Sequence, residues 1–215
     1  MSNCDAFVFI DDVQFSKNSF INRNKIKTSN GSQWLTVPIK QSGKFGQLIK
    51  DTEVNNPHFH STKIKKTIIS NYSKTQNFSV LYPELEIILS KNPETIVNLN
   101  IEIIEWICEK LNILTEFHLC SHLNEIQGNN TKRLVSIVKS LNGNIYYSGF
   151  GGIKYQEQSI FSENNISVKI SDFQHPIYDQ LWGEFIPNLS IIDYIFNEEL
   201  KKCIEFFKKK RNAHA

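Results

Sequence analysis

The chain has 215 residues and a net charge of +2, with 40% apolar and 12% aromatic residues. This length and composition suit one sizeable domain and exclude a disordered chain, and the near-neutral charge gives no electrostatic reason to expect DNA as a partner. In chain order, we predict an apolar strand at residues 6–10 and a second strand at 34–39, where Pro38 places the end at a sheet edge. A third strand is expected at 47–54.

Three helices are predicted in the middle of the chain. The first runs from His60 to Tyr72 and the second over about residues 79–90, both with apolar residues at helical spacing. The third follows Asn92, which we expect to be its N-cap, and ends at Asn112. Its two adjacent apolar stripes indicate a helix that packs into the core.

The second half alternates between strands and helices. We expect strands at 115–120, 145–148 and 167–170, a helix capped by Asn130 or Thr131 and ended by Asn142-Gly143, and a helix over 154–164. This order predicts an α/β fold with a mainly parallel sheet and flanking helices, in a Rossmann-like three-layer architecture. We expect a single domain over residues 1–200, followed by a basic helix or tail at 201–215.

Cysteine usage and hydropathy predict a soluble, cytoplasmic protein. The four cysteines are scattered without a CxxC pair, which suggests free thiols. No stretch reaches the roughly 18 apolar residues that span a bilayer, and no signal peptide opens the chain. His118, Cys120 and His122 would share one face of a strand, but a fourth ligand is not evident, so we predict no metal site. The sequence does not identify a cofactor.

The first candidate site residues are Asp11 and Asp12, which directly follow the apolar strand at 6–10. In open α/β sheets, ligands bind beyond the carboxyl ends of the strands. Adjacent strand residues point to opposite faces, so only one of the two carboxylates could face a given pocket. The alternative is an Asx-type turn that closes the strand.

Two further segments offer groups that could bind an anion or a sugar. Asn22, Arg23 and Lys25 provide amide and cationic donors for a phosphate, a carboxylate or hydroxyl groups, although such residues also occur in ordinary loops. Ser148 ends a predicted strand and leads into Gly149–Gly152, whose backbone amides could approach an anion. A tight turn between strand and helix explains these glycines equally well.

A third segment, residues 173–185, crowds histidine, tyrosine, glutamine and tryptophan together with little periodicity. His175 follows a predicted strand, and a neutral imidazole is the usual general base near physiological pH. We therefore consider His175 a candidate for catalysis or substrate contact. The alternative is a structural histidine that bonds to the backbone.

Four stretches, FVFIDDVQFSKNSFINRNKIKT, QWLTVPI, YYSGFGGIKYQ and FQHPIYDQLWGEFIPNLSIIDYIFN, occur in this order. Together they resemble the WbqC-like family of bacterial proteins over about residues 5–200. Members of that family usually open with a strand that ends in Gln-Pro-x-x-x-Pro-Trp, which we expect to be missing here.

The resemblance implies a role in O-antigen or other surface-polysaccharide biosynthesis. The implied activity is transfer of glycine or another aminoacyl or acyl group to the amine of a nucleotide-linked amino sugar. The catalytic residues that we expect are His175, Asp11 and Asp12. The substrate-binding residues that we expect are Gln14, Asn22, Arg23, Lys25, Trp34, Ser148, Gly149, Tyr155, Tyr178 and Gln180.

The expected partners are a nucleotide sugar and, as the acyl donor, a carrier protein or a tRNA. Two other readings stay open. One is a non-catalytic accessory protein that binds sugar nucleotides, and the other is a nucleotide-dependent enzyme of another class. Replacing His175 by Ala separates the transferase from a binding protein, because an enzyme should lose turnover and retain its ligand, whereas a binding protein should change in affinity alone or not at all. A reaction that consumes ATP in isolation would favour the other enzyme class.

Overall fold

The computed structural model describes residues 1–212, in which the chain forms two compact units. Among the described residues, the first unit contains Met1–Asp11 and Leu114–Gln174, and the second contains Asp12–Ile113 and residues 175–212. The chain therefore passes between the units after Asp11, after Ile113 and after Gln174. The single domain over residues 1–200 stays a prediction.

The first unit is built from two parallel strand pairs. β1 (Ala6–Phe9) pairs with β4 (Glu116–Leu119), and β5 (Ile145–Ser148) pairs with β6 (Ser167–Ile170). Parallel neighbours need a crossover, and α5 (Gln158–Glu163) supplies it between β5 and β6. The remaining helical segments of this unit are η1 (Cys120–His122), α4 (Asn130–Ser140) and η2 (Phe150–Tyr155).

The core of this first unit forms where α4 and α5 cover the β5–β6 pair. Phe161 is fully buried, and its ring stacks on Tyr146 with 5.0 Å between the centroids. Val135 and Ile166 complete the buried cluster. Tyr146 and Val168 are opposite each other in the strand register and both pack on this cluster, so one face of the pair is apolar.

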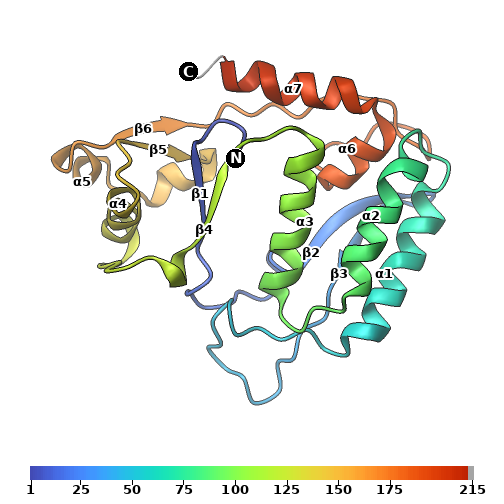
Figure 1. Ribbon diagram of the computed structural model, residues 1–215, viewed down its shortest axis with the longest axis horizontal. Coiled ribbons are helices and arrows are strands. Elements are labelled where there is room, and N and C mark those ends of the chain that lie inside the picture. The colour runs from blue at the N-terminus through green and yellow to red at the C-terminus, as the bar shows by residue number, and fades with distance from the viewer. Residues whose placement is uncertain (213–215) are drawn as a thin grey trace. The chain divides into compact units, whose positions relative to one another are not determined.

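The second unit combines helices with one antiparallel hairpin. α1 (Pro57–Tyr72), α2 (Phe78–Ser90) and α3 (Ile96–Lys110) lie side by side (Figure 1). The hairpin consists of β2 (Arg23–Thr28) and β3 (Gly31–Thr36), which Ser29 and Asn30 connect. The unit ends with α6 (Ile191–Asn197) and α7 (Leu200–Asn212).

The helix boundaries follow from local capping. Asn56 caps α1 by accepting a hydrogen bond from the Phe59 amide, so the helix begins before the expected His60. The expected cap Asn92 was wrong: the N-cap of α3 is Thr95, whose hydroxyl accepts from the Asn98 amide. Asn92 has a left-handed φ of +52° and lies beyond the end of α2.

The α/β class is confirmed, whereas a Rossmann-like three-layer architecture is not, because each described sheet has two strands. The strand expected at 47–54 is reduced to isolated bridges, such as the one between Ile39 and Val54. Turns interrupt it, since Asp51 donates to the Leu48 carbonyl and Thr52 to the Ile49 carbonyl. None of the helices within residues 1–212 is long and apolar enough to cross a membrane.

Candidate functional site

The β2–β3 hairpin collects cationic and aromatic side chains on one face. Arg23, Lys25 and Lys27 alternate along β2 and therefore point to the same side, as does Trp34, which lies opposite Lys25. The Arg23 guanidinium lies 4.1 Å from the centroid of the Trp34 ring, and the Lys25 Nζ lies 5.3 Å from it. Phe20 flanks the indole at 5.6 Å, so two cations share an aromatic platform.

Lys27 is only 1% exposed, and its ammonium group holds the chain that follows His175. Its Nζ donates to the Gln180 side-chain oxygen at 3.0 Å and to the carbonyl oxygens of Gly183 and Glu184. All three ammonium protons therefore have acceptors, as a buried charge requires. The bonds fix a turn in which Trp182 and Gly183 both have left-handed φ angles, of +67° and +80°.

A buried carboxylate completes this network. Asp193 is 0% exposed and accepts hydrogen bonds from the Tyr72 hydroxyl at 2.8 Å and the Tyr178 hydroxyl at 2.7 Å. The backbone amide of Lys27 donates to the Tyr72 oxygen at 3.0 Å. Burial raises the pKa of Asp193, whereas the two tyrosine bonds and the Lys27 charge lower it.

The tyrosines of this network remain protonated near neutral pH. Burial, reinforced by the adjacent Asp193 charge, raises the pKa of both Tyr72 and Tyr178. Gln180 locks Tyr178 in place, because its Nε2 donates to the Tyr178 oxygen at 3.2 Å and to the Ile186 carbonyl at 3.0 Å. Tyr178 and Gln180 thus shape the segment through bonds that are already made.

His175 lies against the same aromatic cluster. Its ring is 6.3 Å from the ring of Tyr178 and 6.3 Å from the ring of Phe185. The Nδ1 atom lies 2.9 Å from the Pro176 carbonyl oxygen. When Nδ1 donates to this carbonyl, Nε2 carries the lone pair that a general base needs.

Asp11 and Ser148, two predicted residues of the first unit, form hydrogen bonds within that unit. Asp11 is 3% exposed and accepts from the Ser121 amide at 2.9 Å and from the Ser121 hydroxyl at 2.6 Å, so it joins the ends of β1 and β4. The Ser148 hydroxyl lies 3.1 Å from both the Gly149 carbonyl oxygen and the Gln156 Oε1. Asp11 and Ser148 both lie at the carboxyl ends of parallel strands, as expected.

Other predicted residues have distinct settings. Tyr155 is 82% exposed at the end of η2. Asn22 is 9% exposed, and its Nδ2 donates to the Val37 carbonyl at 2.9 Å, whereas its buried Oδ1 has no hydrogen-bond partner within the described residues. Gln14 forms an isolated bridge with Leu48. Asp12 begins the second unit.

The structure therefore brings part of the predicted site together. The hairpin face and the segment that covers Lys27 unite five predicted residues of the second unit, namely Arg23, Lys25, Trp34, Tyr178 and Gln180. The expected residues Asp11, Ser148, Gly149 and Tyr155 belong to the first unit. A shared cavity of the two groups stays a prediction.

His118, Cys120 and His122 carry groups that could bind a metal ion. The His118 Nε2 atom lies 3.3 Å from the Glu116 Oε1 atom. Cys120 and His122 lie in the 3-10 helix η1 rather than on a strand. Across residues 1–212, the structure contains no cluster of three or more His, Cys, Asp or Glu residues that could hold a metal ion.

A model of the WbqC-like protein family matches residues 1–204. The chain belongs to this family. A protein of Mycobacterium tuberculosis (strain ATCC 25618 / H37Rv), described as "Uncharacterized protein Rv1507c", is 33% identical over 195 residues, which are 90% of this WbqC-like chain and 84% of that protein. No solved structure matches the chain significantly.

Three residues of the network in this WbqC-like protein were not among the predicted site residues, namely Lys27, Tyr72 and Asp193. Lys27 continues the alternation that begins with Arg23 and Lys25. That alternation was the available signal for a strand with one cationic face. Tyr72 carried no such signal, because it ends a helix whose apolar periodicity accounts for it.

Proposed function

We propose that this WbqC-like protein is a transferase that attaches glycine or another aminoacyl or acyl group to the amine of a nucleotide-linked amino sugar. Its setting would be the cytoplasmic biosynthesis of O-antigen or another surface polysaccharide. The supporting observation is the face of the hairpin on which Arg23 and Lys25 lie over Trp34. No carboxylate of the described residues forms an ion pair with either cation, so both can bind a diphosphate.

The proposed chemistry is amide formation. The sugar amine attacks the acyl carbonyl, the new C–N bond forms, and the bond to the leaving group of the donor breaks with its electron pair. The nitrogen loses one proton, which His175 Nε2 accepts in the tautomer described above. Trp34 would stack on the base or the sugar, and Arg23 and Lys25 would hold the phosphates.

In this proposal the second-unit residue Asp12 is a further catalytic residue, and Gln14 and Asn22 of the same unit contact the substrate. Tyr178 and Gln180 have a positioning role, since their polar atoms are used within the protein. The acyl donor would be a carrier protein or a tRNA.

A mass-spectrometric assay of the whole chain tests the proposal. Nucleotide-linked amino sugars are incubated with glycyl and other aminoacyl or acyl donors, and the acylated sugar nucleotide is the expected product. His175→Ala should lower turnover by about 100-fold or more with little change in the binding of the sugar nucleotide. His58→Ala, which changes an exposed histidine on α1, is the matched control and should retain activity.

A non-catalytic accessory role is the second candidate. It is favoured by the network around Asp193, in which the tyrosine hydroxyls are used for structure. If the sugar nucleotide binds and no tested donor gives a product, and if His175→Ala alters affinity alone, the accessory role replaces the transferase.

A further inference from the structure

The two edges of the β2–β3 hairpin differ in how their backbone groups are used. The amide of Val37 donates to the Asn22 carbonyl, so the backbone groups of these two residues point toward the other strand of the hairpin. Alternation then turns the backbone N–H and C=O groups of Lys25 and Lys27 outward on β2. Three of these four outward groups have partners: the Lys25 carbonyl accepts from the Ser190 amide, the Lys25 amide donates to Asn24 Oδ1, and the Lys27 amide donates to the Tyr72 hydroxyl.

The opposite edge, on β3, is open over its whole length. The same alternation turns the N–H and C=O groups of Ser32, Trp34 and Thr36 outward. None of the described residues forms a hydrogen bond with them. Pairing begins only beyond the strand, where the Pro38 carbonyl accepts from Asn55 and the Lys40 amide donates to Glu53. An unpaired strand edge is a template for another strand.

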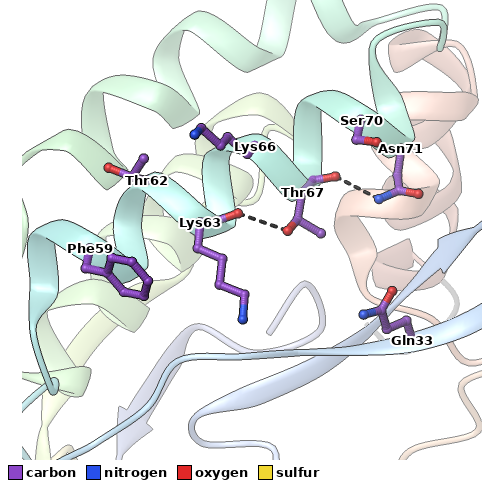
Figure 2. Close-up of a pocket in the computed structure, with 8 residues that line it drawn as sticks. All are labelled: Gln33, Phe59, Thr62, Lys63, Lys66, Thr67, Ser70 and Asn71. Carbon is purple, nitrogen blue, oxygen red and sulfur yellow. Dashed lines mark hydrogen bonds between the residues drawn. The ribbon is translucent and has the colours of Figure 1, made fainter.

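Helix α1 follows this paired segment and borders a groove that it forms with Gln33 of β3. Gln33 of β3 is one wall of the groove, and the other wall is formed by the α1 residues Phe59, Thr62, Lys63, Lys66, Thr67, Ser70 and Asn71. Figure 2 shows the Lys63 side chain extending from α1 into the space between the helix and the strand. The groove has a volume of about 510 Å³.

The dimensions of the groove suit an extended peptide. The helical wall from Phe59 to Asn71 is about 18 Å long at 1.5 Å per residue. About five or six residues of an extended strand cover this length. Backbone hydrogen bonds to the β3 edge would hold such a strand, and alternate side chains would point into the groove.

The positive charge of the groove indicates the charge of the segment that would bind there. Among the described residues that line it, Lys63 and Lys66 are cationic and none is acidic. No carboxylate of the described residues forms an ion pair with either lysine. Exposed Phe59 adds one apolar contact at the start of the helix. An acidic strand would therefore be complementary to the groove.

We propose that the β3 edge and the α1 groove form a docking site for an extended acidic segment of a partner protein, which adds to the hairpin as a third strand. The groove part of this site lies on the face of the hairpin opposite the aromatic platform, because the adjacent side chains of Gln33 and Trp34 point to opposite sides. The proposal does not depend on the transferase function.

Fluorescence anisotropy with the whole chain tests this docking site. The probe is a labelled peptide, Glu-Val-Glu-Thr-Glu-Val, and we expect saturable binding that weakens with added salt. The same peptide with N-methyl groups on alternate amides keeps its charge but cannot add to the sheet, and it should bind at least about tenfold more weakly.

Protein variants separate the contribution of the β3 backbone edge to peptide binding from the contribution of the groove lysines. Lys63→Gln combined with Lys66→Gln should weaken binding about 3- to 10-fold. The matched control is Lys65→Gln on the same helix, which should have little effect because Lys65 bonds to Ser90 on α2. Ser32→Pro removes an outward N–H and should weaken binding without changing the thermal midpoint.

Three results would overturn the proposal. The first is equal affinity for the methylated and unmethylated peptides, which would indicate charge attraction alone. The second is an equal response of the Lys65 variant and the double variant. The third is a dimer in sedimentation that Ser32→Pro dissociates, because the edge would then bind a second copy of the chain.

Discussion

The bond between Tyr72 and Asp193 should be a major contributor to the stability of the second unit, and Tyr72→Phe tests this. The substitution keeps the buried ring and removes only the hydroxyl, which donates to Asp193 and accepts from the Lys27 amide. The Asp193 carboxylate and the Lys27 backbone amide, both buried, would each lose a hydrogen-bond partner. At about 1–3 kcal/mol for each unsatisfied group, with partial relaxation, we expect the free energy of unfolding to fall by about 2–4 kcal/mol.

Urea unfolding followed by tryptophan fluorescence measures this change. Tyr82→Phe is the matched control, because the Tyr82 hydroxyl has a single, longer bond of 3.3 Å to the half-buried Glu86 carboxylate, and the loss should stay below about 1 kcal/mol. The expected loss for Tyr72→Phe is a large fraction of a typical total of about 5–15 kcal/mol. An equal cost for the two substitutions would refute the role assigned to the network.

The pH dependence gives a second, independent check. The Tyr72 bond lowers the pKa of Asp193 in the folded protein, so its removal should raise that pKa further. In the folded variant the Asp193 carboxyl then stays protonated to a higher pH than in the folded wild type, while Asp193 titrates alike in the two unfolded chains. The destabilisation by Tyr72→Phe should therefore grow as the pH rises through the folded-state pKa of Asp193 and shrink in acid. A pH-independent difference would contradict hydrogen bonding to an ionised carboxylate.

Two further predictions concern other parts of the fold. In Gly152→Ala the new Cβ would lie 2.7 Å from both the Ser148 hydroxyl and the Gln156 amide nitrogen, so urea unfolding should show a loss of about 1–3 kcal/mol. Gly151→Ala meets nothing within 4 Å and should change stability by less than about 0.5 kcal/mol; an equal loss would show that the close approach is unimportant. Hydrogen bonds from Lys40 and Lys44 lower the pKa of Glu53 to about 2 from its ordinary value of 4.5. This stabilisation is present above pH 4.5 and is lost as the pH falls toward 2, so Glu53→Gln should flatten the stability curve in that window, and an unchanged acid slope would argue against the pairs.

The helices were the most predictable part of the fold. In α3 the apolar residues recur with the helical period, and the predicted end at Asn112 is close to the observed end at Lys110. β2 was not predicted, because its sequence RNKIKT contains one strongly apolar residue, Ile26. The strand also contains the buried Lys27, whereas hydropathy alone assigns lysine to the surface.

The chemical groups of the candidate site were predictable, and their pairings were not. Residue types identified Arg23, Lys25 and His175 as groups that could bind or react. The bond from Lys27 to Gln180 joins residues 153 positions apart, and the bond from Tyr72 to Asp193 joins residues 121 positions apart. One sequence carries no signal for such distant pairs, because each residue is also compatible with a solvated position.

These pairings separate predicted binding residues whose polar atoms are already bonded within the protein from those that can form new bonds to a ligand. The Tyr178 hydroxyl already donates to Asp193 and accepts from Gln180, so a ligand that captured it would leave a buried carboxylate with one donor fewer. The Lys25 ammonium lies over the Trp34 ring and forms no hydrogen bond or ion pair with a described residue, and the Arg23 guanidinium donates to the Asn18 carbonyl. A phosphate at these two cations would form new charge-assisted bonds while breaking few existing ones. Binding energy should therefore depend on Arg23 and Lys25, whereas changes at Tyr178 should act through the shape of the segment that carries His175.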